Sequence, residues 1–191
     1  MGSPRDPVTT LITFKVIKMM DNFMKTLNHH NTPTLTKINL ESYISGYVDG
    51  EGCFCVSIRP RKSNRTGWEV VASFAIAQNK DRAEVIRLIK NYFNCGFIRK
   101  NIGDNTLKYE TRNLNNLITK IIPHFENYPL QSGKKKDFEV FKKICQKMNK
   151  GKHLTKKGII EISELTSKMN FSGKRRYNKA IVQKCFSKTK I

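Results

Sequence analysis

The sequence predicts an α+β fold in which the order helix, strand, strand, helix, strand, strand, helix (αββαββα) builds one antiparallel sheet. Residues 53–61 alternate between apolar and polar side chains, which is typical of a strand with one buried face. Residues 85–93 instead carry apolar side chains at helical spacing, and turn-forming residues separate such segments. The sheet is therefore expected to have an apolar inner face and a polar, basic outer face.

The first predicted helix begins after Asn39, because an asparagine side chain can cap the free N–H groups of a helix N-terminus. Apolar residues continue at helical spacing to Val48. Gly50 and Gly52 are expected to end the helix.

The remaining elements follow from the same two periodicities. The predicted strands cover Cys53–Arg61, Trp68–Gln78, Phe97–Asn101 and Leu107–Arg112. A hairpin turn at 103–105 joins the last two strands. The later predicted helices cover residues 85–93, 114–125, 138–148 and 158–169.

Three regions are expected along the chain. Residues 1–38 carry weak patterning and are predicted to be an N-terminal extension, partly flexible. Residues 39–172 contain all the patterned segments and form the predicted domain, and residues 173–191 form a basic C-terminal tail.

The charge of the chain favours nucleic acid as the partner. Lys and Arg total 36 against 15 for Asp and Glu, giving a formal net charge of +21. Such self-repulsion suits a protein that binds a polyanion, and phosphate neutralisation drives binding by counterion release. An anionic membrane surface is the rival partner, but no segment approaches the ~18 consecutive apolar residues of a membrane span. A ribosomal-type RNA-binding protein has the same composition.

The five cysteines are scattered and include no CxxC pair, so neither a disulfide framework nor a zinc site is expected. The four histidines form no metal-binding pattern, and no GxxxxGK[ST] phosphate loop occurs. A reducing compartment is therefore expected, and an NTPase is not.

The outer face of the sheet is the expected DNA-binding surface, because basic residues gather there and acidic residues are nearly absent. Arg99 is expected to contact base edges and to prefer guanine, whereas Lys108 should contact phosphate. The alternative is a solvated sheet face with incidental charge. The full predicted DNA-binding set is Ser57, Arg59, Arg61, Glu69, Ser73, Arg99, Asn101, Lys108, Arg112, Lys135 and Lys136.

Residues 44–52 are the most informative segment. Gly46 lies in mid-helix, where glycine costs about 1 kcal/mol relative to alanine, and close approach of another helix would offset that cost. Tyr43, Gly46, Asp49 and Gly50 share one stripe of the helix. Glu51 follows at the negative end of the helix dipole, a position that is unfavourable for a carboxylate unless a cation binds. Glu51 is therefore a candidate metal ligand.

This segment resembles the LAGLIDADG motif of homing endonucleases, with Gly46 third, Asp49 sixth, Gly50 seventh, and then Glu51 and Gly52. The resemblance covers about residues 40–177. Further residues carry it downstream: Phe54, Phe74, Ile76, Gln78, Tyr128-Pro129-Leu130, Lys134, Asp137-Phe138, Leu154-Thr155, Gly158-Ile159 and Met169-Asn170.

The resemblance implies an enzyme that cuts both strands of a duplex with Mg²⁺, for which other divalent cations such as Mn²⁺ can substitute. Glu51 matches the metal-binding acid, and Gly50 is expected to contribute beside it. Gln78 matches a polar residue near the attacking water, while Arg82 and Lys134 match basic catalytic residues. The run 134–136 leaves open which lysine is the catalytic one. Each of these residues also has a non-catalytic interpretation: Gln78 as a strand-end hydrogen-bonding group, Arg82 as a surface charge, and the lysines as phosphate contacts.

Only one copy of the motif is present, and single-motif members of the family form homodimers through their motif helices. The resemblance therefore implies an interface at Tyr43, Gly46, Asp49 and Gly50. The predicted function is a site-specific homing endonuclease that initiates mobility of its host intron. The alternatives are a maturase that binds intron RNA and a DNA-binding protein of the same fold without cleavage. The Lys, Asn and Ile bias suggests an AT-rich genome, hence a mitochondrion, a chloroplast, or the cytoplasm of an AT-rich bacterium.

Overall fold

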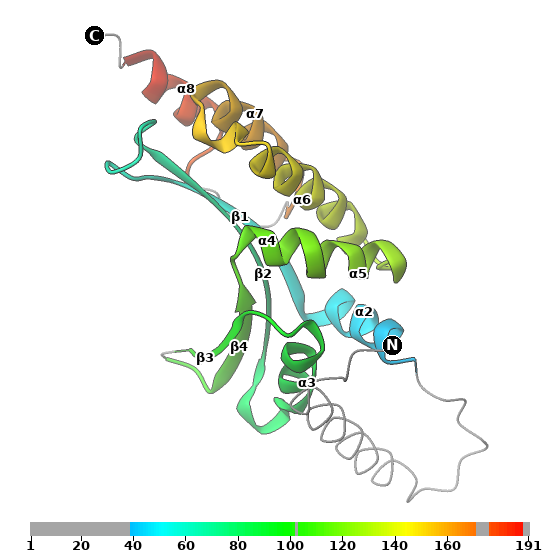
Figure 1. Cartoon of the computed structure of the whole chain (residues 1–191). Coiled ribbons are helices and arrows are strands. Elements are labelled where there is room, and N and C mark those ends of the chain that lie inside the picture. Colours follow the sequence, from blue (N-terminus) through cyan, green and yellow to red (C-terminus); the bar gives the residue numbers. More distant parts are fainter. Residues whose placement is uncertain (1–38, 102, 171–175, 189–191) are drawn as a thin grey trace, which may run out of the picture. The chain divides into compact units, whose positions relative to one another are not determined.

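One antiparallel sheet organises the molecule, in the strand order β1-β2-β4-β3 (Figure 1). A computed structural model describes residues 39–101, 103–170 and 176–188. The predicted α+β architecture is confirmed, and each strand boundary lies within one residue of its expected place. The strands are β1 Gly52–Pro60, β2 Trp68–Asn79, β3 Phe97–Lys100 and β4 Thr106–Thr111. The expected extension at 1–38 and residues 173–175 and 189–191 of the expected tail lie outside the described residues.

The helices pack on the inner face of this sheet (Figure 1). They are α2 Leu40–Glu51, α3 Glu84–Phe93, α4 Leu114–Asn116, α5 Ile122–Asn127, α6 Lys134–Asn149, α7 Lys156–Thr166 and α8 Lys179–Lys188. Short 3-10 helices occur at Lys80–Arg82 and Lys152–Leu154. Within these described segments, no helix is both long enough and apolar enough to cross a bilayer.

Aromatic side chains fill the centre of the core. The Phe54 ring of β1 lies 5.2 Å from Phe74 of β2, and 5.3 Å from both Phe138 and Phe141 of α6. Full burial of one such side chain stabilises the fold by about 1.5–3 kcal/mol. The alternation predicted for β1 places Phe54 on the inner face of the sheet, where its ring packs against α6.

Helix α2 begins as predicted but ends later. The side chain of Asn39 accepts a hydrogen bond from Ser42 N–H at 2.8 Å, which caps the helix. Gly50 remains helical, and Gly52 ends α2 by turning to an extended conformation and donating its N–H to the Val48 carbonyl. A Cβ at Gly52 would lie 2.8 Å from that carbonyl oxygen, so a side chain is excluded there.

The predicted helix 114–125 is interrupted. Between α4 and α5, residues Leu117–Ile121 form a π-helical turn. Pro123, the second residue of α5, lies in the first turn of that helix. Because proline has no N–H and its ring crowds the preceding turn, a widened turn before it is physically reasonable. Hydrophobic periodicity alone does not predict such a turn.

The C-terminal segment contains a helix that was predicted only as a basic tail. The ring of Trp68 packs edge-on against Tyr177 at 5.2 Å and contacts Phe186 of α8 at 6.0 Å. Val182 of α8 is fully buried. Helix α8 therefore adds to the core, next to the β1–β2 hairpin.

A buried histidine connects α2, α3 and α5. The Ser45 hydroxyl donates to the Tyr128 carbonyl at 2.7 Å, so it can only accept from His124 Nε2, at 3.2 Å. Burial lowers the pKa of His124 from 6.5 to about 4, so the ring is neutral near pH 7. With its proton on Nε2, the ring accepts at Nδ1 from the Tyr92 hydroxyl at 3.0 Å.

The free energy of unfolding should therefore decrease as the pH falls from about 6.5 to about 4. In this range the unfolded chain binds a proton at His124 that the folded chain excludes, which costs about 3 kcal/mol of stability at the lower limit. Urea unfolding at several pH values measures the effect. Since the His124→Gln variant cannot titrate there, it should lose most of this pH dependence. An unchanged slope in that variant would contradict the assignment.

Candidate active site and nucleic-acid interface

Glu51 is the last residue of α2, and its side chain is exposed beside the first residue of β1. Among the described residues it makes no hydrogen bond and no ion pair. The α-helix points the negative end of its dipole at this carboxylate, which is unfavourable for an anion, and the nearby Lys134 ammonium offsets part of that cost. The Glu51 oxygens remain available to bind a metal ion.

Lys134, the first residue of α6, lies against the same helix end. Its Nζ donates to the Val48 carbonyl at 2.9 Å and to the Gly50 carbonyl at 3.3 Å. Burial lowers the pKa of the Lys134 ammonium, although Asp49 and the other acidic groups nearby favour its charged form. The side chains of Lys135 and Lys136 are exposed and contact neither carbonyl. The structure therefore brings Lys134, of the three lysines, to the end of the motif helix.

The Asp49 carboxylate is held by the loop before α6. It accepts hydrogen bonds from the Gln131 N–H at 2.7 Å, the Ser132 N–H at 3.1 Å and the Ser132 hydroxyl at 2.7 Å. Partial burial by itself would raise the pKa of Asp49, but these hydrogen bonds and the Lys134 charge hold it below its usual value. Asp49 thus fixes the end of α2 to the loop, within one chain.

Asp49→Asn should destabilise the fold by about 1.5–3 kcal/mol, because an amide cannot accept from all three donors as a carboxylate does. A decrease in the thermal midpoint relative to the unmutated chain measures it. Asp81→Asn makes the same chemical change at an exposed position without a hydrogen-bond partner in the described chain, and should be neutral. Equal midpoints for the two variants would show that the loop contacts contribute nothing.

Gln78 and Arg82 lie at the end of β2. Since Gly52 pairs with Ile76, Gln78 extends two residues past the start of β1, alongside α2. Its Nε2 donates to the Tyr47 hydroxyl of α2 at 3.1 Å, and its Oε1 accepts from the Asn79 N–H at 2.8 Å. Arg82 is exposed after β2 and has no ion pair among the residues described. The structure thus connects Gln78 to the motif helix and leaves Arg82 open to an external anion.

The donor set suits a metal that is shared with a phosphate. No three His, Cys, Asp or Glu side chains come together in the described parts of the chain. One chain therefore offers Glu51 and backbone carbonyls. The Gly50 carbonyl keeps a second lone pair, but the Lys134 ammonium beside it disfavours a cation, so Glu51 is the stronger ligand. Mg²⁺ commonly binds one or two carboxylates and completes its shell with water and substrate phosphates, which fits this arrangement.

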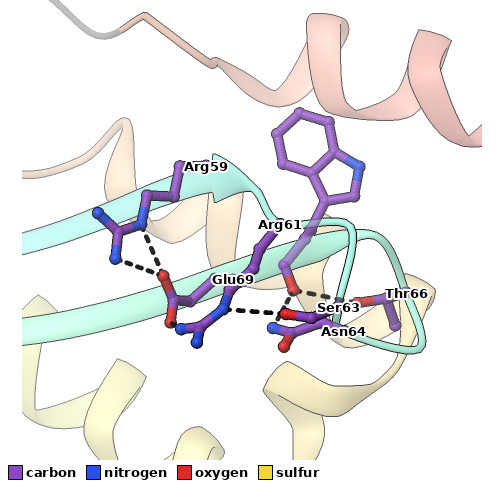
Figure 2. Close-up of polar contacts among 7 residues, drawn as sticks. Arg59, Arg61, Ser63, Asn64, Thr66 and Glu69 are labelled. Atoms are coloured by element: carbon purple, nitrogen blue, oxygen red, sulfur yellow. Dashed lines mark hydrogen bonds and ion pairs between the residues drawn. The ribbon is translucent and has the colours of Figure 1, made fainter.

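The outer face of the sheet differs from the expectation in one respect: acidic residues are present. Glu69 of β2 forms ion pairs with Arg59 and Arg61 of the β1 end (Figure 2). Partial burial alone would raise the pKa of Glu69, but hydrogen bonds from both arginines hold it below its usual value. Glu110 of β4 likewise lies among basic residues, and it was not among the residues predicted for this face. The predicted near-absence of acids from this face is therefore wrong, although basic residues still outnumber them.

Sequence comparison gives the family. The sequence model of the LAGLIDADG endonuclease family matches residues 44–145. The chain belongs to the LAGLIDADG endonuclease family. A "probable intron-encoded endonuclease 2" of Neurospora crassa is 40% identical over 132 residues, which are 68% of this chain and 29% of that protein. The chain thus spans under a third of the length of that curated relative.

Two solved structures share the LAGLIDADG fold. A crystal structure of the homing endonuclease I-TnaI superposes with a TM-score of 0.68 at 32% identity, covering 81% of this chain and all of that one. I-SmaMI, bound to an uncleaved DNA target in the presence of calcium ions, superposes with a TM-score of 0.69 at 30% identity. That match covers 79% of this chain but 49% of I-SmaMI. This LAGLIDADG chain therefore corresponds in extent to half of the DNA-bound protein.

Three contacts of the site were not anticipated from the sequence. They involve Tyr47 with Gln78, Ser132 with Asp49, and Glu110 with its basic neighbours. Only Glu110 had a detectable signal, because Lys108, Glu110 and Arg112 alternate on one face of a predicted strand. The other two contacts join segments far apart in the chain.

Proposed function

We propose that this chain is a site-specific endonuclease that hydrolyses both strands of a long, near-palindromic DNA site and so initiates mobility of its host intron. The main support is the exposed Glu51 carboxylate at the edge of a basic sheet face, which makes no hydrogen bond or ion pair in the described chain and has the Lys134 ammonium nearby. A bare carboxylate beside a phosphate-binding surface opposes DNA binding unless a cation lies between them. A protein that only binds DNA would have no use for it.

The proposed metal site consists of Glu51, with the Gly50 carbonyl as a secondary ligand, and Mg²⁺ or Mn²⁺ there would neutralise charge on the scissile phosphate. Lys134, fixed between two carbonyls, would orient water or stabilise the developing charge. Gln78 would position water through its amide, while Arg82 would contact the phosphate. The predicted DNA-binding residues of the outer sheet face would hold the duplex.

The proposed active form is a homodimer. The match to 49% of I-SmaMI supports it, since a second domain of the same fold is needed for a comparable extent and a second copy of this chain would supply it. Gly46 and Gly50 are exposed on α2, and a Cβ at either would meet nothing within 4 Å. Tyr43 and Asp49 lie on the same stripe, so a second copy of α2 could pack there. A two-fold dimer matches a near-palindromic site.

The experiment uses a duplex built from the joined exons that flank the gene. With Mg²⁺ the purified protein should make double-strand breaks at one position, and EDTA should abolish cutting. A duplex with scrambled sequence is the control. If the protein cuts nothing but accelerates splicing of its own intron RNA, the maturase alternative is correct. If it binds the site without either activity, it is a DNA-binding protein of the same fold.

The proposed location is the mitochondrion. The intron-encoded relative of Neurospora crassa supports an intron gene, and the Lys, Asn and Ile bias of the sequence favours an AT-rich genome such as that of an organelle. Mapping the gene to a mitochondrial, chloroplast or bacterial genome decides between the three locations. The same map supplies the exon junction for the cleavage assay.

A further inference from the structure

Glu110 is a nearly buried carboxylate on the face of the sheet that is proposed to bind DNA. Its side chain is 3% exposed, and its neighbours across the sheet are Ala75 of β2 and Phe97 of β3. Three cations surround it: Arg112 Nη2 at 3.0 Å, Arg99 Nε at 3.7 Å and Lys108 Nζ at 3.7 Å. One carboxylate thus collects three basic side chains from β3, β4 and the residue that follows β4.

The charges explain why the group is stable. A carboxylate removed from water is unfavourable unless it is paired, and here three cations are within ion-pair distance. The dependence is mutual. Without Glu110 the three cations would repel one another and move apart into solvent. The carboxylate therefore determines where these side chains lie before any duplex binds.

The contact with Arg99 leaves its recognition edge available. Glu110 lies at the Nε side of the guanidinium, and Nη1 is 3.4 Å from the Asn101 carboxamide oxygen. The terminal Nη2 has no partner among the described residues. A guanidinium with one side fixed and terminal N–H groups exposed is suited to a bidentate contact with the acceptors of guanine in the major groove.

The other end of the face has the same arrangement. Glu69 accepts from Arg59 at 2.6 Å and from Arg61, and the Arg61 Nε donates to the Ser63 hydroxyl at 3.2 Å (Figure 2). The hairpin beside it is fixed by Asn64 and Thr66, which both donate to the Trp68 carbonyl. Two separate carboxylates thus each order a set of arginines.

We propose that Glu110 is a positioning residue for DNA specificity: it fixes Arg99 for base recognition and limits indiscriminate attraction of phosphate by the surrounding cations. The inference rests on the proposed function, since it assumes that this face binds a duplex. Glu110 itself stays buried beneath the cations and acts through them. A purely structural role, in which the ion cluster only stabilises the β3–β4 edge, makes different predictions.

Duplex binding is measured with Ca²⁺ in place of Mg²⁺, on the exon-junction site and on every single-base-pair variant of it. Arg99→Ala defines the base pairs that Arg99 recognises. Glu110→Gln should lose about tenfold discrimination at those base pairs. Its salt dependence should steepen by about 0.9 in log–log slope, because one more cation is free to contact phosphate. In the Arg99→Ala background, Glu110→Gln should change discrimination no further at those positions.

Glu69→Gln is the matched control, since it removes the equivalent carboxylate of the other cluster and should alter a different set of base pairs. Glu110→Asp keeps the charge on a shorter side chain and guards against a folding defect; it should lose part of the same discrimination. If both Glu110 variants keep full discrimination while their thermal midpoints fall, the role is structural and the inference is wrong. If the unmutated protein prefers no site, the proposed function itself fails, whatever the Glu110 variants do.

Discussion

Glu51→Gln is expected to abolish cleavage of both DNA strands while leaving DNA binding intact. Glutamine keeps the size of the side chain but removes the charge that coordinates a divalent cation. Loss of the metal's contribution, several kcal/mol, corresponds to a decrease in cleavage rate on the order of a thousandfold. Binding without metal should persist or tighten, because removing a carboxylate near phosphate removes a repulsion. Cleavage under single-turnover conditions and binding in Ca²⁺ measure the two effects.

Asp49→Asn is the matched control for this variant. It makes the same carboxylate-to-amide change two residues earlier, but Asp49 is held by the loop at 131–132 and not directed to DNA. It should lower the thermal midpoint or weaken the dimer, and any loss of cutting should follow those changes, whereas Glu51→Gln should stop cutting with the midpoint and the dimer unchanged. A Glu51→Gln variant that cuts as fast as the unmutated protein would show that the metal site lies elsewhere.

Gly46→Leu is expected to prevent dimerisation without harming the fold of the monomer. A Cβ at Gly46 meets nothing within 4 Å in the single chain, so a side chain there is tolerated. Replacing a glycine within a helix also favours the helix by up to about 1 kcal/mol. Against a second α2, however, leucine would overpack the contact at a cost of about 1–3 kcal/mol per subunit. Cleavage of both strands should fall with the loss of the dimer.

Sedimentation of the DNA-free protein at micromolar concentrations, combined with thermal melting, separates these effects. Asn91→Leu adds the same side chain to an exposed position of α3 and should leave the oligomeric state unchanged. The expected result is a monomer of normal or raised thermal midpoint for Gly46→Leu alone. If the unmutated chain is itself a monomer, on DNA as well as off it, the dimer interface is wrong.

The strands were predictable because their alternation is local. The inward side of β1, Phe54, Val56 and Ile58, is buried as the period of two requires. The N-terminus of α2 was also predictable, since its cap bond spans three residues. The C-terminus of α2 and the existence of α8 were not predictable. Gly50 could end a helix or continue it, and the hydrogen bond from Gly52 to Val48 determines where α2 ends. Helix α8 depends on Trp68, far away in the sequence.

The candidate site was also predictable only in part. Glu51 could be singled out because a carboxylate at a helix C-terminus is unfavourable in any chain. The choice among three consecutive lysines could not be made, because it depends on which one the start of α6 directs toward the Val48 and Gly50 carbonyls. Alternation places Glu110 on the outer face, but it does not show which of the charges there are paired.

The ion clusters around Glu69 and Glu110 also determine which residues of this recognition surface must change together during evolution. Arg99 shares one carboxylate with Lys108 and Arg112, so a substitution at one position changes the charge balance of the other two. When one base pair of the DNA target mutates, a single compensating substitution in the protein also disturbs neighbouring side chains that still match their own bases. Adaptation to a new host sequence should therefore proceed by correlated changes within a cluster, and libraries for altered specificity should vary each cluster as a block.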